Sequence, residues 1–255
     1  MPRPRPLIPL LLLTLLLLAA LACNTLQPPK PSLEWDTSPS AVIIEISEGG
    51  GMVPQEYMLN ALHPLRVWGD GRILWVENDS KGGRRVLEGH LTQPEMTDLL
   101  TKISDAGFFG WATSYQPKFQ VYDAGTTTLS VNLTSHSQSV SEYAGEGAPQ
   151  KYHELLAYLS GGAGASGADF APTTGYLTAF AGQPASGQAP YHWPNVSLGY
   201  DLDKAASGMY IEGEALQFAW RAVNESYVAI VESGGMDYHI ALQIPGVSQQ
   251  EPPTK

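Results

Sequence analysis

The stretch PLRVWGDGRILWVE, residues Pro64–Glu77, indicates the fold class of this 255-residue chain. Two apolar runs flank Asp70 and Gly71, a dipeptide typical of two-residue hairpin turns. In the register set by such a turn, four aliphatic residues share one face: Leu65, Val67, Leu74 and Val76. Side chains of a strand alternate between its two faces, so this face is expected to point into a core. The stretch therefore predicts an antiparallel hairpin with one buried face.

The opposite face of the predicted hairpin carries Arg66, Trp68 and Trp75. Tryptophan and arginine dominate binding hot spots because they combine a large contact area with polar groups. These three side chains are a candidate binding patch for a sugar ring or a protein partner. The alternative is that another part of the chain covers this face, which would place both tryptophans in a core.

A helix with complete start and stop signals is expected after a third strand at Arg85–Leu91. Thr92 and Glu95 have the spacing of a capping box, and Gly107 is placed to end the helix. Between them, four apolar residues recur at helical spacing: Met96, Leu99, Leu100 and Ile103. The pattern predicts an amphipathic helix with one buried stripe.

The rest of the chain continues the alternation of strands and helices. Strands are expected at 41–47, 129–133 and 176–180, helices at 149–160 and 214–224, and a final hairpin at Gly234-Gly235. The expected turns place Val131 opposite Val140 and Val231 opposite Tyr238. This order predicts an α+β fold of antiparallel β-hairpins packed with amphipathic helices.

The N-terminus has the three parts of an export signal. Arg3 and Arg5 precede an apolar run at residues 7–22, which ends in small residues before Cys23, the only cysteine. Ala20-Leu21-Ala22-Cys23 resembles a lipobox, whose cysteine carries fatty acids such as palmitate and becomes the mature N-terminus. Ordinary cleavage after Ala-Leu-Ala and an uncleaved anchor are the alternatives. A single thiol in an exported chain favours lipidation of Cys23.

These signals and a Gly/Ala/Ser-rich stretch after residue 160 divide the chain. The predicted segments are a signal peptide at 1–22, a lipidated N-terminus with a proline-rich tether at 23–40, an α+β domain at 41–160, a linker at 161–172, a smaller α+β domain at 173–247 and a flexible tail at 248–255. The sequence thus predicts two small domains on one anchor.

Charge excludes some partners. The chain has 14 Lys and Arg residues against 25 Asp and Glu residues, and removal of a signal peptide would also remove Arg3 and Arg5. Nucleic acid repels so acidic a body, so it is not expected as a partner. The expected contact with the membrane is the lipid on Cys23, which places the protein on the extracytoplasmic side of the cell membrane or outer membrane.

No local motif indicates catalysis. The six histidines do not form a metal-binding spacing, and nucleophile and phosphate-loop motifs are missing from the sequence. No cofactor, metal or catalytic residue is therefore predicted. Two weaker candidates are Glu232 with Asp237, expected to face each other beside a turn, and the aromatic run at Tyr191–Trp193.

Several short stretches together resemble uncharacterised bacterial lipoproteins. They are the lipobox, GDG at Gly69–Gly71, AGFF at Ala106–Phe109, DAGTTTLSVN at Asp123–Asn132 and, more weakly, IPG at Ile244–Gly246. The resemblance covers mainly residues 41–160 and implies export and architecture. It transfers no activity and no catalytic residue.

The sequence as a whole favours a membrane-anchored lipoprotein that binds a protein or a glycan of the cell envelope. Whether the chain is an enzyme stays open, with the balance toward a binding protein. The alternatives are a hydrolase whose site is assembled from distant residues, which leaves no local motif, and a structural accessory of a membrane complex.

Overall fold

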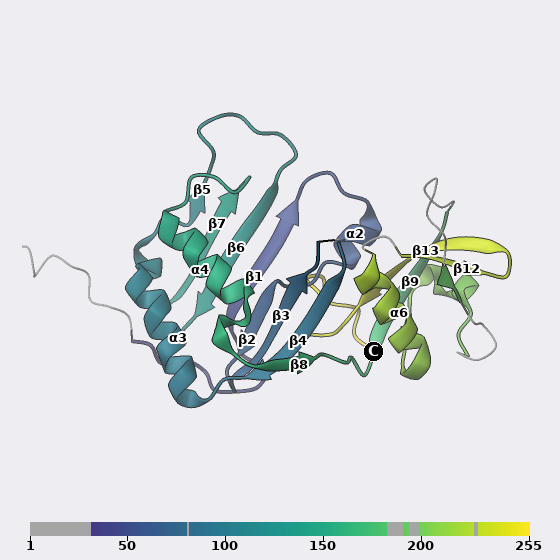
Figure 1. Cartoon of the computed structure of the whole chain (residues 1–255), viewed down its shortest axis with the longest axis horizontal. Coiled ribbons are helices and arrows are strands. Elements are labelled where there is room, and N and C mark those ends of the chain that lie inside the picture. Colours follow the sequence, from purple (N-terminus) through teal and green to yellow (C-terminus); the bar gives the residue numbers. More distant parts are fainter. Residues whose placement is uncertain (1–31, 81, 183–190, 194–198, 227–228) are drawn as a thin grey trace, which may run out of the picture. The chain divides into compact units, whose positions relative to one another are not determined.

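The computed structural model places the predicted hairpin within an eight-stranded sheet (Figure 1). The structure describes residues 32–80, 82–182, 191–193, 199–226 and 229–255. Cys23, the signal peptide and the first part of the predicted tether lie outside the described residues. Antiparallel pairing dominates both sheets, and helices pack with them, which confirms the predicted α+β fold class.

The first sheet has the strand order β5-β7-β6-β1-β2-β3-β4-β8. Its strands are β1 Val42–Gly50, β2 Leu65–Trp68, β3 Arg72–Asn78, β4 Arg84–His90, β5 Ser114–Tyr115, β6 Gly125–Asn132, β7 Ser137–Tyr143 and β8 Gly167–Asp169. The two short edge strands differ in direction: β5 runs parallel to β7, whereas β8 is antiparallel to β4.

The second sheet has the order β10-β12-β13-β9-β11. Its strands are β9 Gly175–Ala181, β10 Tyr191–His192, β11 Met209–Ile211, β12 Ala229–Ser233 and β13 Met236–Gln243. The predicted final hairpin is β12 with β13, and its predicted register is confirmed because Val231 pairs with Tyr238.

Four α-helices lie in the described residues: α2 Gln55–Leu59, α3 Gln93–Ala106, α4 Gln150–Ser160 and α6 Gly213–Glu225. Short 3-10 helices cover Phe108–Gly110, Gly162–Gly164 and Leu202–Ser207. None of the helices in the described part of the chain is long and apolar enough to cross a membrane. The sequence missed α2, which buries none of its residues and so lacks an apolar stripe.

Helix α3 begins and ends where its capping residues predict. The Thr92 hydroxyl accepts a hydrogen bond from the Glu95 backbone N–H, and the Glu95 carboxylate accepts one from the Thr92 N–H at 2.7 Å. Gly107 ends the helix with a φ of 95°, a conformation that glycine adopts without steric cost. The four residues of the predicted stripe are all buried, which confirms the amphipathic pattern.

Two apolar cores lie on opposite faces of the first sheet. Helices α3 and α4 cover one face, where Leu100 and Leu159 are buried together with aliphatic residues of β1, β2 and β6 (Figure 1). On the other face, Leu74 and Val86 share a core with residues of the second sheet and α6, such as Leu216. Residues from both predicted domains therefore pack in this second core.

The first hairpin has a different turn from the one predicted, so its predicted register is wrong. Leu65 pairs with Trp75, and Val67 pairs with Ile73. Three residues form the loop instead of two, and Gly71 has a φ of 95°, as in a type I turn followed by a left-handed residue. A shift of one residue exchanges the faces of the second strand. Leu74 and Val76 consequently face the second core, while the first core takes Ile73 and Trp75.

The β6–β7 hairpin is also shifted from the prediction, but by two residues. Val140 pairs with Leu129 and Val131 with Gln138. A two-residue shift keeps every side chain on its expected face. The alternation predicted for this strand is therefore confirmed, since Leu129 and Val131 are buried.

The segment 161–172, predicted as a linker, contains a 3-10 turn and strand β8. Its glycines permit a close approach to the core. A Cβ atom on Gly162 would lie 2.7 Å from the indole ring of Trp75, and one on Gly167 would overlap the same ring. The small residues read as a sign of flexibility thus allow this segment to cover a tryptophan.

Candidate functional site

The predicted binding patch of Arg66, Trp68 and Trp75 is not present as an exposed surface. Trp68 is only 5% exposed and Trp75 only 3%, and the two belong to the cores on opposite faces of the sheet. The one-residue shift of the hairpin places Trp75 in the first core. Trp68 stays on the predicted face beside Arg66, but residues of the second sheet cover this face.

Arg66 takes part in an internal ion-pair cluster. Its guanidinium contacts the Glu45 carboxylate at 2.6 Å and donates a hydrogen bond to the Gly246 carbonyl at 2.9 Å. It also lies 2.6 Å from Nε2 of His63, a buried residue. Burial, followed by the charge of Arg66, lowers the pKa of His63, so the neutral ring accepts from Arg66 and donates through Nδ1 to the Ile46 carbonyl.

The large exposed apolar side chains of the described residues gather elsewhere. Two segments, 52–58 and 119–122, contain all but Met236. The members are Met52, Val53, Tyr57 and Met58 in the first segment and Phe119, Val121 and Tyr122 in the second. Large exposed apolar side chains concentrated in two segments are a candidate interaction site.

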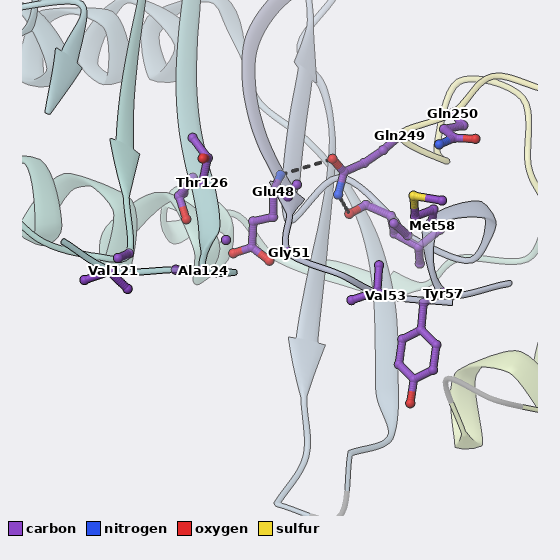
Figure 2. A pocket seen from close by; sticks show the side chains of 17 residues that line it. Glu48, Gly51, Val53, Tyr57, Met58, Val121, Ala124, Thr126, Gln249 and Gln250 are labelled. Atoms are coloured by element: carbon purple, nitrogen blue, oxygen red, sulfur yellow. Dashed lines mark hydrogen bonds between the residues drawn. The ribbon is translucent and has the colours of Figure 1, made fainter. Parts of the chain in front are cut away.

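A groove of about 870 Å³ lies between these two segments (Figure 2). We call it the binding groove. It is lined by Glu48, Gly49, Gly50, Gly51, Val53, Tyr57, Met58, Ala61, Leu62, Val121, Ala124, Gly125, Thr126, Thr127, Ala144, Gln249 and Gln250. The ends of β1 and β6 contribute to the lining, as do α2, the loop before β6 and the C-terminal segment. The groove therefore joins residues as far apart in the sequence as Glu48 and Gln250.

The floor of the binding groove contains a break in the pairing of the first sheet. On one side, β1 pairs with β6 as far as Gly50. On the other side, its pairing with β2 stops at Ile46 opposite Leu65. Residues Ser47–Gly50 are therefore paired with β6 on one side, and on the other side they have no neighbouring strand within the described residues.

The side chain of Gln249 spans this break. Its Oε1 accepts a hydrogen bond of 3.1 Å from the backbone N–H of Glu48, and its Nε2 donates one of 3.0 Å to the Leu62 carbonyl. Figure 2 shows both bonds, with the amide between the end of β1 and the segment that precedes β2. One primary amide thus connects two main-chain segments that are too far apart to pair directly.

Glu48 supplies the only carboxyl group among the described residues of the lining. Its side chain extends into the space beside Ala124 and Gly51 (Figure 2). It is solvent accessible, yet the groove walls remove enough water to raise the pKa of its carboxyl above the ordinary value. A cationic group bound beside Glu48 would replace the lost solvation.

The weaker candidates from the sequence have structural roles. Glu232 and Asp237 pair as predicted, but the Glu232 carboxylate accepts from the Gly235 N–H and contacts His192, and these two contacts, in that order, lower its pKa. Trp193 is 1% exposed and donates from Nε1 to the Tyr200 carbonyl, so it is a core residue. Within the described residues no cluster of three or more His, Cys, Asp or Glu side chains is arranged to hold a metal ion.

Sequence reasoning missed the binding groove because each of its segments has a weak local pattern. The glycines at 49–51 indicate only a strand end, and the apolar residues at 52–58 lack a strand or helix period. The available signal was the group of large apolar residues beside three glycines, with no periodicity that would bury them. Comparison of the chain with protein-family models, with curated proteins and with solved structures finds no match.

Proposed function

We propose that this protein is a lipid-anchored binding protein of the bacterial cell envelope, which holds a segment of a partner protein in the binding groove. The observation that carries the proposal is the concentration of exposed apolar side chains in the two segments beside the groove. Their exposure costs free energy in water, and a partner that covers them recovers it.

The lining favours a protein segment over a glycan. Tyr57 is the only aromatic residue among the described residues of the lining, and most of the others are aliphatic or glycine. Sugar rings are bound by aromatic faces together with many polar groups, whereas apolar side chains of a protein fit aliphatic walls.

The proposed anchor rests on the sequence of the N-terminus and on Cys23. Leu33 and Trp35, near the end of the predicted tether, pack against the first core, and Trp35 donates from Nε1 to the Gly69 carbonyl. Only eight residues lie between Cys23 and Ser32, and this segment reaches about 30 Å when fully extended. A lipid on Cys23 would therefore keep Ser32 within about 30 Å of the membrane surface.

The test is site-specific photocrosslinking in the protein's own cells, with p-benzoylphenylalanine in place of Met58 or of Met236. The two methionines are matched because they are 43% and 49% exposed, and only Met58 lines the groove. We expect one recurrent envelope protein to crosslink at Met58 and none at Met236. The same adduct should weaken in Cys23→Ser, whose intact mass would show no lipid.

Two results would contradict the proposal. Equal crosslinking at Met58 and Met236 would show that the partner does not bind preferentially at the groove. An intact mass without fatty acids on the unsubstituted protein would refute the proposed lipid anchor.

A further inference from the structure

The strand edge in the binding groove has features that a bound peptide backbone would use. Between Ser47 and Gly50, β1 is paired only on the β6 side, and across the break lies the Leu62 carbonyl. Backbone N–H and C=O groups at a sheet edge are a template for an additional strand.

The contacts of Gln249 show where such a strand would bind. Its amide offers one acceptor to the Glu48 N–H and one donor to the Leu62 carbonyl, the same pair of groups that a peptide bond carries. It occupies the place of one main-chain amide between two main-chain segments. A peptide strand entering the break would make these two bonds itself and displace the side chain into solvent.

The charge at this edge selects among peptides. Residues directly opposite each other in an antiparallel pair have side chains on the same face and in contact. A peptide residue opposite Glu48 would therefore lie beside its carboxylate, and the acidic net charge of the chain, −11, attracts a cationic segment from a distance. Around Glu48 the walls are apolar, including Val53, Met58 and Val121.

We infer that the binding groove takes an extended peptide segment as an added strand on the edge of β1, with a lysine or arginine opposite Glu48 and apolar side chains beside it. This inference rests on the proposed function and names the partner's chemistry. The main chain of the segment replaces the Gln249 amide, and its side chains cover the apolar walls.

The experiment begins with random heptapeptides displayed on phage and selected on the full-length protein in detergent micelles. Clones that also bind Met58→Arg are discarded. The remaining clones should still bind Met236→Arg, which serves as the control. The best heptapeptide is then synthesised with single N-methyl groups along its backbone and with norleucine in place of its lysine, or alanine in place of its arginine. Binding is measured by titration calorimetry.

Strand addition predicts an alternating response. N-methylation at every second residue should weaken binding at least about tenfold, because it removes a hydrogen bond to β1. Among the residues between, only the one whose N–H donates to the Leu62 carbonyl should respond, and the others should tolerate the methyl group. Neutralising the cationic residue should weaken binding about three- to fivefold in the unsubstituted protein and leave it unchanged in Glu48→Gln. Gln249→Ala should bind at least as tightly as the unsubstituted protein.

A response to N-methylation without alternation would overturn strand addition. Selected peptides that lack a cationic residue would overturn the proposed contact with Glu48. If crosslinking at Met58 captures a partner but no groove-dependent heptapeptide is selected, the proposed function stands and this inference fails. If no partner crosslinks at Met58 and no groove-dependent heptapeptide is selected, the proposed function and this inference both fail.

Discussion

Asn60→Ala is expected to lower the free energy of unfolding, because Asn60 connects the segment between α2 and β2 to the second sheet. Asn60 is 1% exposed, and its side chain makes two hydrogen bonds to β13. Nδ2 donates to the Ile240 carbonyl at 3.2 Å, and Oδ1 accepts from the Leu242 N–H at 2.8 Å. With alanine at this buried position, the Ile240 carbonyl and the Leu242 N–H both lose their hydrogen-bond partner.

The expected loss is about 2–6 kcal/mol, since each of the two buried backbone groups left without its partner costs about 1–3 kcal/mol. For a body of this size, about 2–4 °C per kcal/mol, that loss lowers the melting temperature by about 4–24 °C. Asn60→Asp is expected to be worse at neutral pH because its carboxylate would face the Ile240 carbonyl. Its buried acid would have a raised pKa, so stability should recover as the pH falls and the protonated acid can donate.

Urea denaturation followed by tryptophan fluorescence measures both variants, with Asn132→Ala as the control. Asn132 is exposed and donates one hydrogen bond to the Val42 carbonyl, so its loss should change the free energy of unfolding by no more than about 0.5 kcal/mol. Equal losses for Asn60→Ala and Asn132→Ala would refute the reasoning. So would a pH dependence of Asn60→Asp that matches the unsubstituted protein.

Three further outcomes are expected. Thr92→Ala should cost about 1 kcal/mol in urea denaturation because it removes the cap of α3, and a loss below 0.3 kcal/mol would contradict this role. Gly71→Ala should destabilise more than Gly82→Ala in the same assay: both have positive φ, but only a Cβ on Gly71 overlaps a backbone carbonyl. The lowered pKa of His63 means that the unfolded chain protonates first as the pH falls. The melting temperature should therefore decrease as the pH falls below about 6.5, and less steeply in His63→Gln. Equal slopes for the two proteins would contradict the lowered pKa.

Local signals determined the elements whose patterns are self-contained. The capping box at Thr92 and the stripe through Ile103 specify α3 because all of their partners lie within a few residues. The hairpin at Gly234-Gly235 is correct in register because its two glycines admit one turn and its apolar alternation admits one pairing.

Local signals do not determine the register of the first hairpin. Both possible turns around Gly71 place aliphatic residues on one face, so alternation cannot choose between them. The structure adopts the three-residue loop, in which Gly69 accepts a hydrogen bond from Trp35 and Gly71 approaches the backbone of Leu91. Both faces of the hairpin are covered, so neither face needs to be polar.

The sequence by itself determined the α+β class and the principal helices, and the export signal with a lipid on Cys23 stays a prediction. Only the tertiary structure decided which apolar residues are covered. It buried Trp68 and Trp75, and it left Val53 and Met58 exposed beside an unpaired edge of β1. The physical reason is that burial depends on which distant segment packs against a residue, whereas capping and alternation depend on its neighbours in the chain.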